Sequence, residues 1–161
     1  MSLLTIANAV ADETKGPRPE TIATNTDPAA QNILRLINKV AIRMMLVYNW
    51  NILRKEHAFS ASGNEIVLAS ANIPADFNRF VTETFWDRGS NNLVSGPVSP
   101  VEWQGLKVQT FSSSNKKFIF RGGDVYALPI FASGTSLSFE YVSDKWAVAA
   151  ADGSKKTSFT I

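Results

Sequence analysis

Residues 27–50, DPAAQNILRLINKVAIRMMLVYNW, decide the fold class of the first third of the chain. Asp27 followed by Pro28 is typical of a helix start, because an acidic N-cap accepts hydrogen bonds from the first turn and proline is favoured at the first helical position. Apolar residues then recur every three or four positions, so we expect one helix over 28–48, about 30 Å long. One of its faces carries Ile33, Leu36, Ile37, Val40, Met44 and Val47.

Another face of the same helix is basic but also apolar. Arg35, Lys39 and Arg43 follow one another at intervals of four residues, and Ile42 and Leu46 lie between and beside them. Packing against a single core requires an apolar stripe only about 100° wide. The excess predicts that this helix is buried twice, once within its own subunit and once against another molecule.

The three basic residues allow three interpretations. They could form an ordinary solvated helix face, pair with acidic groups on a neighbouring subunit or partner, or line a channel that carries DNA. Three charges per subunit give a weak field alone, but repetition around a ring would multiply it.

A shorter helix is expected upstream, over residues 2–13. Ser2 is placed as its N-cap, and Gly16, Pro17 and Pro19 end it, since proline cannot continue a helix and glycine favours the C-cap. Residues 20–27 are rich in Thr and Asn, which is typical of a loop.

The periodicity changes from helical to alternating after Trp50. We expect strands at 51–60, 64–70, 81–87, 117–121, 124–129, 136–143, 145–151 and 156–161. Turns are expected at 62–64 (a hairpin joining the first two strands), 74–77, 122–123 (a second hairpin) and 132–135. A short helix over about 99–107 is indicated by Ser99 as N-cap, Pro100 and Glu102.

These elements predict an α+β fold. Residues 1–50 would form an N-terminal helical arm or bundle, with helices at about 2–13 and 28–48. Residues 51–161 would form a compact antiparallel β-sandwich or partial barrel that includes the short helix.

Composition excludes several classes of protein. The chain of 161 residues has no cysteine and one histidine, so disulfides and thiolate metal sites are excluded. A net charge of +2 is too small to indicate a nucleic-acid-binding protein. No apolar run approaches the roughly 18 residues of a membrane helix, and the N-terminus lacks the features of a secretory signal. We therefore expect a chain that folds in the cytoplasm and has no membrane partner.

Residues that could carry chemistry are sparse. His57 falls inside an expected strand, and Ser60 and Ser62 lie nearby without a nucleophile-elbow motif. Gly122 and Gly123 stand between two alternating segments, which favours a hairpin turn over a phosphate-binding loop. Glu83, Glu102 and Glu140 could be brought together by strands, but nothing in their spacing marks them. We expect no catalytic residue, cofactor or metal site, and hence no enzyme.

Aromatic residues are abundant after residue 48. We expect a core of Phe77, Phe80, Phe85, Phe118, Phe120, Phe139 and Tyr141, which occupy alternating positions. Each tryptophan stands beside a polar residue at an element boundary, which suits either the edge of the core or a subunit interface. Trp50, Trp86 and Trp103 join Arg35, Lys39, Arg43, Ile42 and Leu46 as candidate interface residues.

An ordered set of short phrases resembles a known family. After Asp27-Pro28 and the long helix ending at Trp50 come IPADF at 73–77, FWD at 85–87 and GPVSPVEW at 96–103. FIFRGG at 118–123 and FEYVS at 139–143 with Trp146 complete the set. In this order they resemble the head–tail adaptors of tailed bacteriophages, the connector, tail tubular or tail accessory class. The similarity spans roughly residues 1–153.

This resemblance implies a structural virion protein of the phage neck, folded in the host cytoplasm before assembly. It implies a homo-oligomeric ring of twelve copies under the portal protein, joined below to tail nozzle or fibre proteins. DNA would pass through the ring without sequence-specific binding during genome ejection. The family pattern continues past Asp152-Gly153 into a C-terminal helical segment, whereas residues 156–161 here alternate. No docking role is therefore carried over to that segment.

Two other functions compete with the adaptor. A tail-fibre or baseplate β-module that binds carbohydrate would use its tryptophans, since aromatic rings stack on sugars; Trp103 is the residue to test. A hydrolase would use Glu83 or Glu140 as an acid or base.

Overall fold

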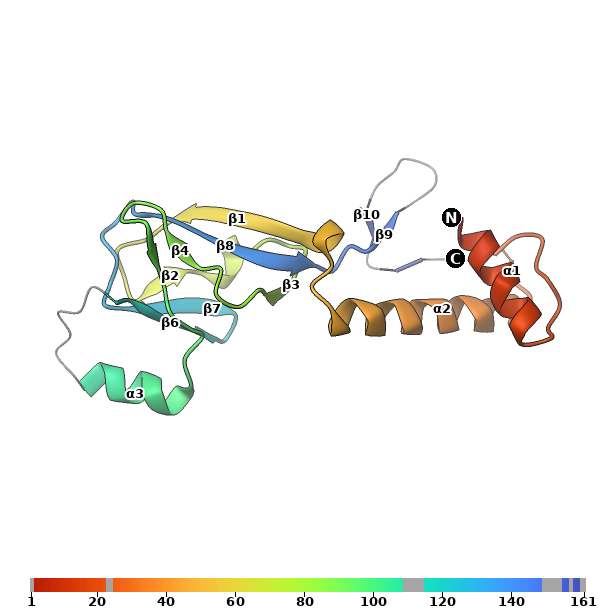
Figure 1. Cartoon of the computed structure of the whole chain (residues 1–161), viewed down its shortest axis with the longest axis horizontal. Coiled ribbons are helices and arrows are strands. Elements are labelled where there is room, and N and C mark those ends of the chain that lie inside the picture. The colour runs from red at the N-terminus through yellow and green to blue at the C-terminus, as the bar shows by residue number, and fades with distance from the viewer. Residues whose placement is uncertain (1, 23–24, 109–114, 149–154, 157, 160–161) are drawn as a thin grey trace. The chain divides into compact units, whose positions relative to one another are not determined.

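The computed structural model describes residues 2–22, 25–108, 115–148, 155–156 and 158–159 (Figure 1). The fold is α+β, as predicted: α-helices precede antiparallel sheets, and the described strands form no closed barrel. The chain divides into two compact units. One comprises Met1–Leu53 and Asp144–Ile161, and the other comprises Arg54–Ser143.

The two N-terminal helices begin at the predicted caps. Helix α1 (Leu3–Glu13) has Ser2 as its N-cap, whose side chain accepts from the N–H of Thr5. Helix α2 (Pro28–Val47) has Asp27 as its N-cap, accepting from the N–H of Ala29 at 3.1 Å. At the end of α1 the prediction of a glycine C-cap was wrong: Thr14 is the C-cap and Lys15 takes the left-handed conformation (φ 53°).

The helical unit has its own small core. Ala7 of α1 and Ala30 of α2 are almost completely buried, which lets the two helices approach closely, and Leu34, Ile37 and Ile22 complete the cluster. The C-terminal segment joins this core rather than the β-domain. Phe159 packs against the cluster.

This grouping differs from the predicted domains, which placed all of 51–161 in the β-rich part. One set of hydrogen bonds ties the residues after Ser143 to α2, and two further contacts join these residues to one another. The side-chain amide of Asn38 bonds the backbone of Phe159, the ring of Trp146 meets that of Phe159 at 5.2 Å, and β9 (Ala147–Val148) pairs with β10 (Lys155–Lys156). The parts of the expected strands at 149–151, 157 and 160–161 lie outside the described residues.

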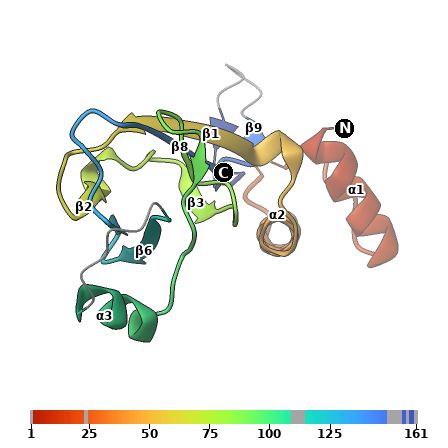
Figure 2. The same ribbon diagram turned by 60° about the vertical axis from the view of Figure 1, so that its left-hand side comes forward.

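The larger sheet of the second unit is built on β8 (Ser136–Ser143). Strand β1 (Arg54–Ser60), preceded by the 3₁₀-helix η1 (Asn51–Leu53), pairs with one side of β8 along its whole length. Strands β4 (Trp86–Asp87) and β3 (Phe77–Phe80) pair with the other side of β8, and β5 (Asn92–Leu93) pairs with β4. All of these pairings are antiparallel (Figures 1 and 2).

A three-stranded sheet, in the order β2–β7–β6, covers this one. Its strands are β2 (Ile66–Leu68), β6 (Lys117–Arg121) and β7 (Asp124–Leu128). The predicted hairpin at Gly122-Gly123 is confirmed: both glycines have positive φ (61° and 88°), as a tight two-residue turn requires, and Arg121 stands opposite Asp124. Helix α3 (Pro100–Val108) lies against this sheet, with Ser99 accepting from the N–H of Glu102.

The two sheets enclose an aromatic core. Phe85, Phe118, Phe139 and Tyr141 are buried, and Phe77, Phe80 and Phe120 pack against them, which confirms the predicted set. Neighbouring rings meet mainly edge to face, as Phe85 and Phe118 do at 4.7 Å.

Two local predictions for this unit were wrong. The turn around Gly63 exists, but it does not join a hairpin, because β1 pairs with β8 while β2 pairs with β7. The expected strand at 81–87 is reduced to β4. Thr84 replaces the strand ladder there, because its hydroxyl donates to the carbonyl of Val81 and accepts the N–H of Glu140. Strands β3 and β5 and the 3₁₀-helix η2 (Ser70–Asn72) were not predicted.

Candidate interaction surface

Helix α2 uses a narrow arc for its own unit. The buried residues are Ala30, Leu34, Ile37 and Met45. Only Ile37 belongs to the face that the sequence singled out, so the phase of the inner face was missed. The available signal was the row of Ala30, Leu34, Ile37, Ala41 and Met45, in which alanines permit close packing.

Most of the larger apolar residues outside this arc remain exposed, whereas Ile33 is partly buried against the helical core. We call Leu36, Val40, Met44 and Val47 the apolar stripe; their exposed fractions are 47%, 45%, 53% and 66%. They are spaced by four, four and three residues, so they lie on one side of the helix. The helix therefore presents a continuous apolar side that its own unit leaves uncovered.

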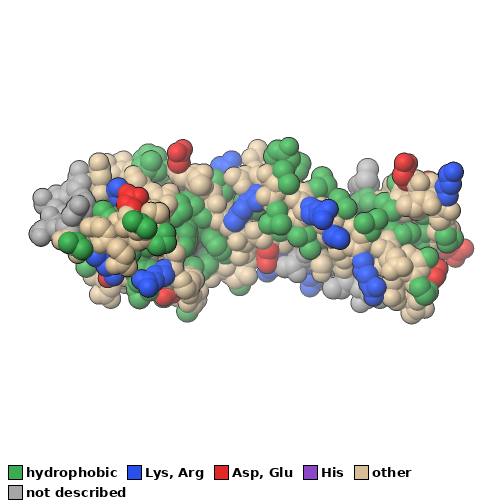
Figure 3. Space-filling model, turned by 90° about the horizontal axis from the view of Figure 1, so that it is seen from below, with side chains coloured by type: hydrophobic (Ala, Val, Ile, Leu, Met, Phe, Trp, Pro, Cys, Tyr) green, Lys and Arg blue, Asp and Glu red, His purple; other side chains and the backbone are tan. Residues whose placement is uncertain are grey.

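The basic residues and their apolar neighbours are also exposed. Arg35, Lys39 and Arg43 are exposed and form no ion pair with any residue that the structure describes. Ile42 and Leu46 beside them are 40% and 53% exposed. No acidic residue occurs within α2, so the helix carries three uncompensated positive charges. Figure 3 shows hydrophobic and cationic side chains interspersed on this face of the molecule.

Trp50 closes the exposed end of α2. Its indole Nε1 donates to the carbonyl of Met44 at 2.9 Å, which satisfies one of the last-turn carbonyls that have no partner within a helix. Tyr48 meets the Trp50 ring edge to face at 5.6 Å. Trp50 itself is 41% exposed, so the cap extends the apolar surface of the helix.

The two remaining candidate tryptophans lie in the β-domain and differ sharply. Trp86 on β4 is at the surface and stands opposite Leu93 on β5, which is also exposed. Trp103 of α3 is only 1% exposed and packs with Leu106 and Ile119. Its assignment to an interface is therefore corrected: the ring fastens α3 to its own sheet.

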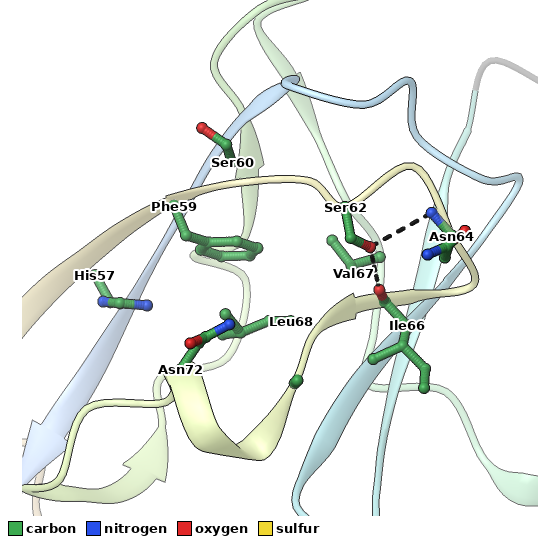
Figure 4. Close-up of a pocket in the computed structure, with 10 residues that line it drawn as sticks. His57, Phe59, Ser60, Ser62, Asn64, Ile66, Val67, Leu68 and Asn72 are labelled. Carbon is green, nitrogen blue, oxygen red and sulfur yellow. Dashed lines mark hydrogen bonds between the residues drawn. The ribbon is translucent and has the colours of Figure 1, made fainter.

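His57 lies beside a pocket but lacks the partners of a catalytic base. It projects from β1, and its ring stacks on that of Phe59 at 5.5 Å (Figure 4). Burial lowers the pKa of His57, which favours the neutral form of the ring. The hydroxyl of Ser62 donates to the carbonyl of Ile66 rather than to the histidine. This is the arrangement of a packed histidine.

Asp76 is the carboxylic acid whose pKa is shifted most, and the contacts that shift it hold the fold together. Its carboxylate accepts from Tyr141 at 2.9 Å, from Ser143 at 2.7 Å and from the Lys55 ammonium. Burial alone would raise the pKa of Asp76, but these hydrogen bonds and the Lys55 charge hold it well below its ordinary value. Every partner belongs to β1 or β8, so the group ties the start of β3 to the sheet.

The surroundings of Glu83 and Glu140 do not support their use as a catalytic acid and base. Glu83 is exposed in a turn with φ of 62°, and the carboxylate of Glu140 is bound by Arg54. Within the described ranges, no group of three or more metal-ligating side chains comes together.

Comparisons with known proteins leave the family unassigned. No protein-family model matches the chain, and no curated protein matches it. Among the residues placed by the structure, no helix combines the length and hydrophobicity needed to cross a bilayer.

Proposed function

We propose that this protein is a structural assembly subunit whose copies associate through helix α2. The observation that carries the proposal is the apolar stripe of Leu36, Val40, Met44 and Val47, each close to half exposed or more. Completing the burial of such side chains would contribute roughly 1 kcal/mol each. Because the stripe is continuous, one neighbouring surface could cover it in a single contact.

The narrower proposal is a head–tail adaptor of a tailed bacteriophage. It is supported by the ordered sequence phrases from Asp27-Pro28 to Trp146, and by an exposed helix suited to repeated contacts around a closed ring. In this proposal twelve copies assemble beneath the portal protein and bind tail nozzle or fibre proteins in the virion neck. Arg35, Lys39 and Arg43 would then face acidic groups of a neighbour or the DNA in the channel.

The carbohydrate-binding alternative loses its main residue. Trp103 was the tryptophan expected to stack on a sugar, and its ring is enclosed by α3 and the sheet beneath it. Trp86 remains at the surface, but no cluster of exposed rings accompanies it among the described residues of the β-domain.

The proposal is tested by measuring the mass of the full chain alone and with the portal protein. Native mass spectrometry should detect a multi-copy complex, at least with the portal present, and cryo-electron microscopy of the virion neck should show the same ring. A chain that stays monomeric in both samples and is absent from virions would refute it.

A further inference from the structure

Both sheets of the β-domain end on the same side, at β1 and at β2. Strand β1 pairs with β8 through all seven of its residues and with no other described strand. Strand β2 is likewise an outer strand of the three-stranded sheet, whose other outer strand is β6. Residues of β1 and of β2 line one common pocket (Figure 4).

Alternate residues of β1 direct their backbone groups away from β8. The N–H of Ala61 donates to the carbonyl of Thr135 at 2.8 Å and so continues the β1–β8 ladder. Backbone groups alternate sides along a strand, so Glu56, Ala58 and Ser60 turn their N–H and C=O groups toward the open edge. An unbroken row of this kind is a template for another strand.

A pocket of about 440 Å³ lies directly beside this edge. Phe59 and His57 reach into it from β1, Leu68 and Ile66 line it from β2, and Asn72 lines it from η2 (Figure 4). None of the lining residues is acidic, lysine or arginine, four are serine or asparagine, and burial favours the neutral form of the single histidine. The pocket therefore suits an uncharged side chain.

We propose that the β1 edge and this pocket form a binding site for an extended segment of a different protein. The segment adds a strand beside β1 and inserts one uncharged side chain into the pocket. Backbone hydrogen bonds supply affinity in this mode of recognition, and the pocket supplies specificity. The site lies within the β-domain and is independent of the proposed association through α2.

A second copy of β1 is a poorer occupant than a foreign strand. The side chains that β1 places on the pocket side are Lys55, His57 and Phe59, and each is already held in its own copy. Lys55 binds Asp76, while His57 and Phe59 stack on each other and contact Phe139. Pairing two β1 edges would therefore bring no uncommitted apolar side chain into either pocket.

The test uses the full chain and a capped synthetic peptide, Thr-Val-Thr-Phe-Thr-Val-Thr. The matched control peptide replaces both valines with proline, which removes two strand N–H groups and disfavours the regular pairing. NMR titration should show binding of the first peptide, with slowed amide exchange at Glu56, Ala58 and Ser60. The control peptide should bind at least tenfold more weakly.

Two variants and one control locate the site on the protein. Ala58→Pro removes an outward N–H and leaves the β8 ladder intact, since proline is tolerated on an edge strand. Asn72→Trp fills the pocket from η2. Each should weaken peptide binding at least tenfold, whereas Ala71→Trp, exposed on η2 but outside the pocket lining, should leave it unchanged.

Three results would overturn the proposal. The first is equal binding of the two peptides or of neither, and the second is unchanged binding by both Ala58→Pro and Asn72→Trp. The third is protection of β1 amides that rises with protein concentration when no peptide is added, which would identify a second copy as the occupant. Thermal unfolding of each variant establishes that it is folded before binding is compared.

Discussion

The side-chain amide of Asn38 and the backbone of Phe159 exchange two hydrogen bonds across 121 positions of sequence. Nδ2 of Asn38 donates to the Phe159 carbonyl at 3.0 Å, and the Phe159 N–H donates to Oδ1 of Asn38 at 3.1 Å. The amide thus acts as a short piece of strand, satisfying both backbone groups of a residue that packs on the helical core. Asn38 of α2 therefore anchors Phe159 to the helical unit.

Replacing Asn38 with alanine should release this anchor. We expect the Phe159 amide to exchange at least tenfold faster and the helical unit to lose about 1–3 kcal/mol, since two partly buried backbone groups lose their partners. Hydrogen exchange followed by NMR measures the first effect, and thermal unfolding measures the second. Asn32→Ala, at an exposed position of the same helix, is the control. Unchanged exchange at Phe159 would show that the bonds are not formed in solution.

Asp76 should make the β-domain sensitive to acid. Its folded pKa lies below its ordinary value of 3.8, so its contribution to stability is full above that pH and is lost as the pH falls further. Asp76→Asn should cost about 2–3 kcal/mol at neutral pH and flatten the loss of stability below pH 3.8. Urea unfolding as a function of pH provides the measurement. An identical acid profile in the variant would exclude Asp76 as the source.

The same variant should change the titration of one tyrosine. Burial and the hydrogen bond to the Asp76 carboxylate raise the pKa of Tyr141 to about 12. Removing the negative charge should bring that pKa down, and ultraviolet titration of the phenolate should detect it as one tyrosine that ionises earlier. Tyr141→Phe identifies which of the three tyrosines is involved. No movement of that step in Asp76→Asn would contradict the contact.

Two glycines should respond in opposite ways to alanine. Gly96 has a φ of 148°, and a Cβ there would meet the Phe118 carbonyl oxygen at 2.5 Å, so Gly96→Ala should cost about 2–4 kcal/mol. Gly105 lies inside α3 with open space around the added atom, so Gly105→Ala should stabilise by about 0.5–1 kcal/mol. Urea unfolding followed by tryptophan fluorescence compares them. Equal effects would mean that the backbone around Gly96 differs from this structure.

The features of this fold that depend on a few adjacent residues were predictable from the sequence. Ser2 and Asp27 fixed the helix starts, and Gly122-Gly123 fixed the β6–β7 hairpin, because caps and tight turns depend on a few adjacent residues. The pairing of β1 with β8 was not predictable, since the partners are about 80 residues apart and the turn at Gly63 suggested a nearer one. Thr84 likewise interrupts an apparent strand through a side-chain bond that periodicity does not report.

The candidate surface was predictable in kind but not in position. Too many apolar residues on α2 indicated an uncovered side, but helical spacing alone could not decide which side faces α1. That choice depends on Ala7 of α1 and Ala30 of α2 joining one buried cluster, an arrangement of two helices that sequence periodicity does not encode. Trp103 was misplaced for a similar reason: its position at an element boundary gave no sign that α3 folds back onto β6.

The apolar stripe on α2 offers the most direct test of the proposed assembly. Val40→Glu combined with Met44→Glu places two charges in its centre while keeping good helix formers. Thr5→Glu combined with Ala9→Glu adds the same charge at the same spacing on exposed positions of α1 and serves as control. Sedimentation velocity of the full chain with the portal protein should show several copies sedimenting together for the wild type and the control, whereas the stripe variant should sediment as a monomer. A stripe variant that is folded and assembles as the wild type does would contradict the claim that copies associate through α2.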